Sequence, residues 1–148
     1  MEISEILSPE RIRCNVAVNS KKAALETLAG LIAEADPDIT QNEVFESLIA
    51  RERLGSTGLG HGIALPHGRR KGGVHTIAAF MQLQNGIQYD AIDQRPVDLL
   101  FALLVPEEST EEHLQILSRL ATMFSDNALV GEIRSGETVD AIFSTLTR

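Results

Sequence analysis

Apolar residues recur at helical spacing in two stretches near the N-terminus. The first stretch follows Asn19-Ser20, either of which can cap a helix, and ends at Asp36-Pro37. The second follows Thr40, which forms a capping box with Glu43, and reaches about Arg53. We therefore predict two amphipathic helices with these inward residues: Ala24, Leu25, Leu28, Leu31, Ile32 and Ala35 in the first, and Val44, Phe45, Leu48 and Ile49 in the second.

The stretches predicted as strands differ in their patterns. Ile12 to Val18 alternates between apolar and polar residues, which is typical of a short strand. Ile77 to Leu83 is apolar, and a turn at Asn85-Gly86 would bring Ile87 to Ile92 back beside it as a second strand. Val97 to Val105 is apolar at eight of nine positions without alternation, so we predict a central strand that is covered on both faces.

Helical spacing returns in the C-terminal part of the chain. Ser109 and Glu112 form a capping box for a helix with these inward residues: Leu114, Leu117, Leu120, Ala121 and Phe124. Residues 126–134 and 137–146 have the spacing of two shorter helices, which Gly136 separates. Helices before and after a group of strands predict an α/β fold, in which helices cover both faces of a mixed β-sheet.

The length and composition are those of one folded domain. The chain has 148 residues, 43% hydrophobic and 23% charged, so we expect a single domain over residues 1–148. Its net charge of -8, from 13 basic and 21 acidic residues, argues against a general nucleic-acid-binding surface. Basic residues cluster between Arg51 and Lys71, and such a local patch suits a small anion or a protein partner.

The single cysteine and the lack of long apolar runs limit the class of protein further. Cys14 has no second cysteine to pair with, which excludes an internal disulfide and a cysteine metal site. Neither Met1 to Glu10 nor any later stretch has the pattern of a signal peptide or the length of a membrane span. We therefore expect a cytoplasmic protein that is not embedded in a membrane.

The stretch from Arg51 to Arg70 combines five glycines with four arginines. Glycine lets the backbone approach a ligand closely, and converging N–H groups beside arginines can hold a phosphate. No G-K-[ST] follows the glycines, and no G-x-G-x-x-G opens a helix, so the stretch is not a nucleotide-binding loop. The sequence predicts a site for a phosphate group rather than for a nucleotide.

His67 is the candidate for chemistry within this stretch. A neutral imidazole has one nitrogen with a free lone pair, which can attack a phosphoryl group while the other nitrogen is held by a hydrogen bond. Pro66 fixes its own φ and restricts Leu65 to extended geometry, which would hold His67 stiffly. The alternative is a glycine-rich turn that carries an incidental surface histidine.

The stretch from Arg51 to Arg69, R-E-R-L-G-S-T-G-L-G-H-G-I-A-L-P-H-G-R, closely resembles the active-site motif of the mannitol/fructose-type (type-2) enzyme IIA domains of the bacterial phosphoenolpyruvate-dependent phosphotransferase system. The resemblance covers nearly the whole chain and includes H-L-x-x-L-S at His113 to Ser118. The segment Y-D-A-I-D-Q-R-P-V-D-L-L-F-A-L-L-V-P, from Tyr89 to Pro106, resembles the nitrogen-regulatory branch more than the sugar-transport branches. So does the standalone length, without an attached IIB or IIC segment.

The resemblance implies roles for three residues. It makes His67 the acceptor of a phosphoryl group from the phosphohistidine of a small phosphocarrier protein. His113 matches the second active-site histidine of the family, which would donate a hydrogen bond to the phosphoryl oxygens. Arg51 matches the active-site arginine, whose planar fork suits phosphate oxygens. Without the resemblance, His113 would be interpreted as a capping-turn or interface residue and Arg51 as a solvated helix end.

Other residues of the motif have weaker assignments. Ser56 and Thr57, with the backbone of Gly58, are candidate phosphate contacts, although the two hydroxyls could instead bond their own loop. His61 with another histidine could suggest a metal site. No Cys, Asp or Glu completes a ligand set at a characteristic spacing, so we expect no metal and no cofactor.

The resemblance implies a regulatory phosphotransferase. We expect reversible phosphorylation on His67 by a carrier of the HPr or NPr type, and regulation of partners such as transporters or kinases by the phosphorylation state. A homodimer stays open as its assembly. One alternative is a sugar-specific enzyme IIA that passes the phosphoryl group to a IIB cysteine. The other alternative is a non-enzymatic anion-binding interaction module.

Overall fold

The computed structural model describes residues 2–108 and 110–148. Its sheet has six strands, and the order along it is β1-β5-β6-β3-β2, with β4 also paired to β6. The elements in chain order are α1 (Ile3–Ile6), η1 (Pro9–Arg11), β1 (Ile12–Val16), α2 (Lys21–Ala33), α3 (Gln41–Glu52), β2 (Gly58–Gly60), β3 (Ile63–Ala64), β4 (His67–Arg70), β5 (Ile77–Ile87), β6 (Val97–Pro106), α4 (Thr110–Met123), α5 (Asn127–Ser135) and α6 (Val139–Leu146).

The sheet is mixed, and β6 lies at its centre. β6 runs antiparallel to β5 on one side and parallel to β3 and β4 on the other. β1 is parallel to β5, and β2 is antiparallel to β3. The apolar run from residue 97 to 105 is therefore the central strand, as its lack of alternation predicted.

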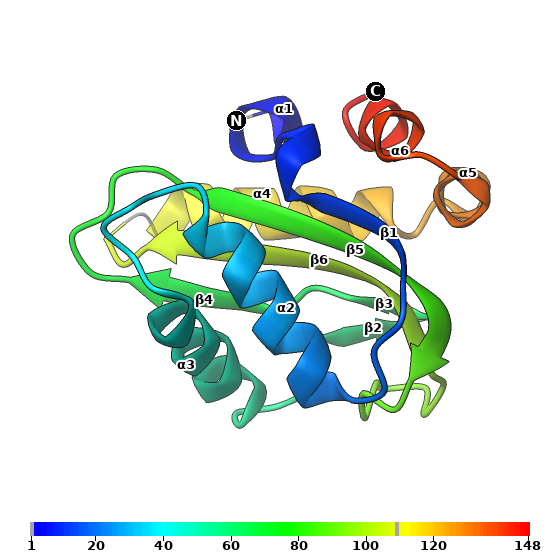
Figure 1. Cartoon of the computed structure of the whole chain (residues 1–148), viewed down its shortest axis with the longest axis horizontal. Coiled ribbons are helices and arrows are strands. Elements are labelled where there is room, and N and C mark those ends of the chain that lie inside the picture. The colour runs from blue at the N-terminus through cyan, green and yellow to red at the C-terminus, as the bar shows by residue number, and fades with distance from the viewer. Residues whose placement is uncertain (1, 109) are drawn as a thin grey trace.

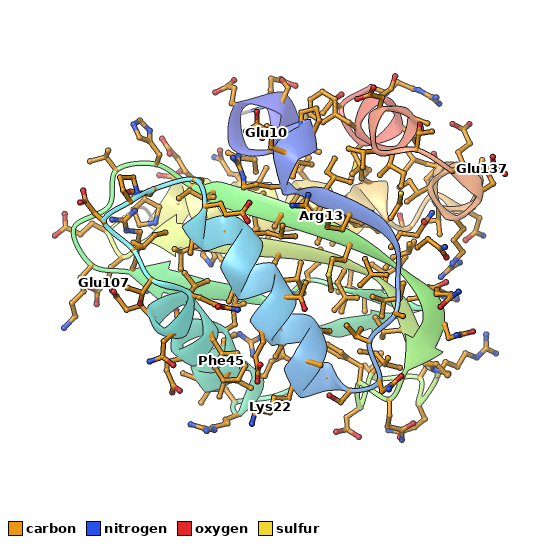
Figure 2. The ribbon with its side chains drawn as sticks, viewed as in Figure 1. Glu10, Arg13, Lys22, Phe45, Glu107 and Glu137 are labelled. Carbon is orange, nitrogen blue, oxygen red and sulfur yellow. The ribbon has the colours of Figure 1, made fainter. Side chains whose placement is uncertain are left out.

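Helices cover both faces of the sheet, which confirms the α/β prediction. Figure 1 shows α2 and α3 in front of the sheet and α4 behind it. The side chains in Figure 2 fill the space on each side of the strands and form two hydrophobic clusters, one per face. Alternate residues of β6 belong to different clusters: Leu100 and Leu104 face α2 and α3, and Phe101 and Leu103 face α4.

The caps predicted for the N-terminal helices are present. The Ser20 hydroxyl accepts a hydrogen bond from the backbone N–H of Ala23, and the Thr40 hydroxyl accepts one from that of Glu43. The Glu43 carboxylate bonds the Thr40 hydroxyl, at 3.1 Å, rather than closing a capping box through the backbone. Within the described ranges, no helix combines the length and apolarity that crossing a membrane requires.

The predicted turn at Asn85-Gly86 is wrong. β5 runs through this pair without reversing, and the pairing with β6 shifts register between Gln82 and Ile87. The chain reverses after β5 instead, where Asp90 and Gln94 have positive φ. Residues 84–86 are exposed at this irregularity, and Ile87 beyond them is buried and pairs with Val97. The pairing and burial of Ile87 outweigh the local turn preference of Asn-Gly.

The inward face of α4 agrees with the prediction only in part: Leu120 and Phe124 are buried and Leu117 packs against the same cluster, as predicted. His113 and Ile116 are buried as well, whereas Leu114 is 63% exposed and Ala121 is also exposed. The difference arises because the apolar residues alone do not show that a histidine lies on the buried face. The capping box predicted at Ser109 lies outside the described residues.

Candidate active site

β3 and β4 form one strand that is interrupted at Leu65-Pro66. Both pair with the same side of β6, and the Pro66 carbonyl accepts a hydrogen bond from the Leu103 N–H at 3.0 Å across the interruption. His67 is the first residue of β4 and pairs with Leu103. The sequence predicted a loop histidine; the structure instead fixes it to the central strand.

Alternation along β4 turns His67 away from α3. The next residue, Gly68, faces α3 so closely that an added Cβ would lie within 2.9 Å of the Ser47 Cβ. Because neighbouring strand residues point to opposite faces, the His67 side chain lies on the α4 side, as does its partner Leu103. Glycine at position 68 thus lets α3 pack against β4 while His67 stays on the other face.

His67 and His113 lie together at this face. Their ring centroids are 5.6 Å apart, with the rings tilted by 51°. His113 is 6% exposed, and its Nδ1 is buried with no hydrogen-bond partner among the described residues. Burial lowers the pKa of the His113 imidazole, and the charges of His67 and Arg69 lower it further. The fold thus joins two histidines from distant parts of the sequence.

One nitrogen of the His67 ring is already engaged. Nδ1 lies 2.8 Å from the Leu65 carbonyl oxygen, which can only accept, so Nδ1 carries the proton. The pKa of His67 is lowered, above all by burial, and the Leu65 bond opposes this. The charges of Arg51 and Arg69 lower the same pKa, and the Glu52 carboxylate raises it. The neutral ring therefore has its free lone pair on Nε2.

We expect the His67 imidazole to titrate below its ordinary pKa of 6.5. The unfolded chain then binds the proton more readily than the folded chain does, so the free energy of unfolding should fall as the pH drops through 6.5. A long-range ¹H–¹⁵N NMR titration of the ring nitrogens, with a histidine peptide as reference, measures this. A titration midpoint above that of the peptide would contradict the expectation.

Arg51 lies in the last turn of α3 and is half-buried. Its Nη1 donates a hydrogen bond to the Gly55 carbonyl at 2.9 Å, which ties the helix end to the glycine-rich stretch. Its positive charge lowers the pKa of His67. Among the described side chains it forms no ion pair with a carboxylate, so its guanidinium is not neutralised by an acid of its own helix.

The three residues expected to contact phosphate have partners within the protein. The Ser56 hydroxyl donates to the Tyr89 carbonyl at 3.3 Å and accepts from the Gly58 N–H at 3.1 Å. Thr57 is buried, and its hydroxyl donates to the Glu52 carboxylate. The bond between Ser56 and Gly58 lies within the loop, whereas the bonds to Tyr89 and Glu52 join the loop to other parts of the fold.

His61 lies apart from His67, on the turn between β2 and β3. Its backbone N–H donates to the Asp93 carboxylate at 2.9 Å, and its φ of 56° is left-handed. The Arg134 guanidinium binds the His61 carbonyl and pairs with Asp98 at the start of β6. In the part of the chain that the structure describes, no group of three or more His, Cys, Asp or Glu side chains could hold a metal ion.

The sequence analysis missed one buried acid beside the site. Glu52, the last residue of α3, is only 8% exposed and pairs with Lys21 at 2.9 Å. It lies four residues after the buried Leu48, on the same face of the helix. That spacing was the available signal, because a charged residue on an inward stripe needs a buried partner.

The fold and the motif together identify the class of protein. The family model described as "Phosphoenolpyruvate-dependent sugar phosphotransferase system, EIIA 2" matches residues 5–148. The chain belongs to this family of phosphotransferase-system components.

Several relatives of the chain are nitrogen regulatory proteins. That of Pseudomonas aeruginosa is 44% identical over 143 residues, which cover 97% of this chain and 93% of the relative. That of Escherichia coli K12 is 38% identical over 148 residues, which cover 99% and 90%. These similarities agree with the nitrogen-regulatory branch that the segment from Tyr89 to Pro106 indicated.

Solved structures give the same result. The nitrogen regulatory protein IIA-Ntr of Neisseria meningitidis superposes with a TM-score of 0.93 at 40% identity, and the alignment covers 98% of this chain and 99% of that one. The mannitol IIA of Escherichia coli shares the fold, with a TM-score of 0.78 at 21% identity over 95% of this chain and 98% of that one.

Proposed function

We propose that this chain is a phosphoryl-accepting enzyme IIA of a nitrogen-regulatory phosphotransferase system, reversibly phosphorylated on His67 by a histidine phosphocarrier protein. The observation that carries the proposal is the 2.8 Å contact between His67 Nδ1 and the Leu65 carbonyl, because it leaves Nε2 as the nucleophile. The lowered pKa of His67 supports the same role, since it keeps the ring neutral near pH 7.

The transfer exchanges one P–N bond for another. The lone pair of His67 Nε2 attacks the phosphorus of the carrier's phosphohistidine, in line with the bond that breaks. The electron pair of that bond returns to the carrier's imidazole nitrogen. Nδ1 keeps its proton and its bond to Leu65 throughout, so the step needs no proton transfer on His67. The protein's task is to position the two nitrogens and to stabilise charge on the phosphoryl oxygens.

Two side chains supply that stabilisation in the proposal. An unpaired buried N–H costs more than an unpaired lone pair, so the buried Nδ1 of His113 favours the tautomer with its proton on Nε2. This N–H would donate to the phosphoryl oxygens. Arg51 would contribute the charge and planar fork of its guanidinium. Ser56, Thr57 and Gly58 would act by shaping the loop, because their polar groups already bond within the protein.

Phosphorylation would make the site a switch. A phosphoryl group adds roughly -1.5 to -2 charges at pH 7, at the end of a strand where Arg51 and Arg69 already act on His67. Partner proteins such as transporters or kinases would then distinguish the two states by charge. We place this exchange in the cytoplasm, where the carrier would be met.

Incubation with a phosphorylated carrier protein tests the function. We expect stoichiometric, acid-labile and base-stable phosphate on the chain, and no onward transfer to a IIB protein in the presence of candidate sugars. Efficient transfer to a IIB cysteine with sugar phosphorylation would favour a transport role instead. Phosphate binding without a covalent phosphohistidine would leave only an anion-binding module.

Arg51→Ala should slow phosphoryl transfer about tenfold, and Arg51→Lys less, because lysine keeps the charge but loses the planar fork. The wild-type rate should also fall with added salt, since the basic groups near His67 contribute to steering. Stopped-flow or quenched-flow transfer from the phosphorylated carrier gives these rates. If Arg51→Lys and Arg51→Ala both behave like wild type, Arg51 is only a solvated helix end.

A further inference from the structure

A buried acid lies next to the nucleophile and has no role in the transfer step described above. The Glu52 side chain is 3% exposed, and its Oε1 lies 2.9 Å from Lys21 Nζ. Burying a carboxylate is costly unless an opposite charge and hydrogen bonds replace its water. Lys21 is itself held, since its Nζ also donates to the Tyr89 carbonyl at 3.2 Å and lies 4.3 Å from the centre of the Tyr89 ring.

Glu52 accepts hydrogen bonds from one residue of the glycine-rich stretch, Thr57. The backbone N–H of Thr57 lies 3.2 Å from each carboxylate oxygen, and the Thr57 hydroxyl donates to Oε2. The Tyr89 hydroxyl lies 3.2 Å from the Thr57 oxygen. Because the single hydroxyl proton of Thr57 goes to Glu52, Tyr89 is the donor in this last bond. Thr57 is therefore fixed by three bonds from its N–H and its hydroxyl.

From Thr57 the contacts lead directly to the nucleophile. The Thr57 carbonyl accepts a hydrogen bond from the Leu65 N–H at 3.1 Å. The Leu65 carbonyl in turn accepts from His67 Nδ1 at 2.8 Å. Glu52, Thr57, Leu65 and His67 thus form a continuous chain of hydrogen bonds, and each member positions the next.

We infer that Glu52 is a positioning residue for phosphoryl transfer, which acts through Thr57 and Leu65 to hold the His67 ring with Nδ1 protonated and Nε2 free. The inference rests on the proposed role of His67 as phosphoryl acceptor. Glu52 does not touch the phosphoryl group; it fixes the backbone carbonyl that selects the tautomer. Its negative charge also raises the pKa of His67 against the effect of burial, which favours the positive character that the ring gains on phosphorylation.

The test combines one isosteric variant with two readouts. Glu52→Gln keeps the shape of the side chain and removes its charge. It should shift the ¹⁵N resonances of the His67 ring toward a mixture of tautomers in the unphosphorylated protein. It should also slow single-turnover transfer from the phosphorylated carrier about tenfold. The control is Glu132→Gln on α5, which removes the same charge from an exposed ion pair with Arg148. It should change neither readout.

A role confined to stability gives a different result. A folded Glu52→Gln protein with wild-type ring resonances and a wild-type transfer rate would overturn the inference, whatever its melting temperature. If Glu52→Gln fails to fold, Thr57→Val tests the inference instead. It removes the hydroxyl that donates to the Glu52 carboxylate and leaves Glu52 in place. It should move both readouts in the same direction, and Thr57→Ser should restore them. Wild-type values in folded Thr57→Val would overturn the inference as well.

The two readouts separate this inference from the function on which it rests. If wild-type protein accepts no phosphoryl group from the carrier, the proposed function fails. The ring resonances of the unphosphorylated variants still show whether Glu52 sets the His67 tautomer. If the variants keep the wild-type ring resonances and transfer rate while wild-type protein is phosphorylated normally, the positioning role of Glu52 is rejected and the proposed function stands.

Discussion

His67→Ala should abolish phosphoryl acceptance from the phosphorylated carrier. Alanine has no nitrogen to form the new P–N bond, and Arg51 and Arg69 are not nucleophiles at neutral pH. His113 does not replace it, because its Nδ1 is buried and its Nε2 carries the proton in the proposed tautomer. Intact-mass spectrometry under basic conditions should therefore detect no added phosphate on the variant. The fold should persist, because His67 is only half-buried and its strand pairing with β6 uses backbone groups.

A second histidine of the same stretch supplies the control. His61→Asn should be phosphorylated like wild type, since asparagine tolerates the left-handed φ of 56° and His61 lies on the turn between β2 and β3. Circular dichroism and thermal melting should show that both variants are folded. Stoichiometric phosphate on folded His67→Ala would show that another residue is the acceptor.

His113→Ala should still accept a phosphoryl group, but roughly 10²-fold more slowly. That figure corresponds to about 2 to 3 kcal/mol of transition-state stabilisation, the range for one preorganised donor. The 5.6 Å separation of the two ring centroids brings the His113 ring near the phosphoryl group on His67 Nε2. Rapid-quench kinetics with excess phosphorylated carrier gives the single-turnover rate, and the final extent of phosphorylation should stay close to one per chain.

Partial rescue would identify the interaction that is lost. His113→Gln offers an amide N–H that can donate, so it should recover part of the rate, whereas His113→Leu should not. Because His113 is buried on α4, each variant should be compared only after its melting temperature has been measured. Wild-type kinetics in folded His113→Leu would remove His113 from the transfer step.

The sequence predicted much of the fold because the spacing of apolar residues in most elements reflects which of their faces is buried. β6 lacks alternation because two separate clusters cover it, and α2 follows its cap at Ser20. The Asn85-Gly86 turn failed because a local preference says nothing about the strand opposite, and here β5 continues along β6. The inward face of α4 was predicted only in part, since Leu120 and Phe124 are buried as expected but His113 is buried as well.

The motif selected the candidate site residues, but it did not predict the hydrogen bonds around them. His67, His113 and Arg51 were all selected from the motif, and two of them are rings 5.6 Å apart. The direction of a hydroxyl is set by the tertiary structure around it, so the bonds of Ser56 to Tyr89 and of Thr57 to Glu52 could not be predicted. The buried pair of Glu52 and Lys21 was missed as well, although the spacing of Glu52 from Leu48 indicated the inward face of α3.

Because His67 lies on a strand, the number of residues between it and β3 decides which face of the sheet its side chain occupies. Side chains of β4 alternate, so the face that each one occupies depends on whether its distance from β3 is odd or even. One extra residue in the link at Leu65-Pro66 would exchange the faces of the imidazole and of Gly68. The ring would then collide with Ser47, and no imidazole of β4 would face His113. Two extra residues would return the imidazole and the glycine to their original faces. They would still separate the Leu65 carbonyl from His67 Nδ1, so that this hydrogen bond would be lost. The Ala-Leu-Pro-His segment is therefore constrained in its number of residues as well as in their identity.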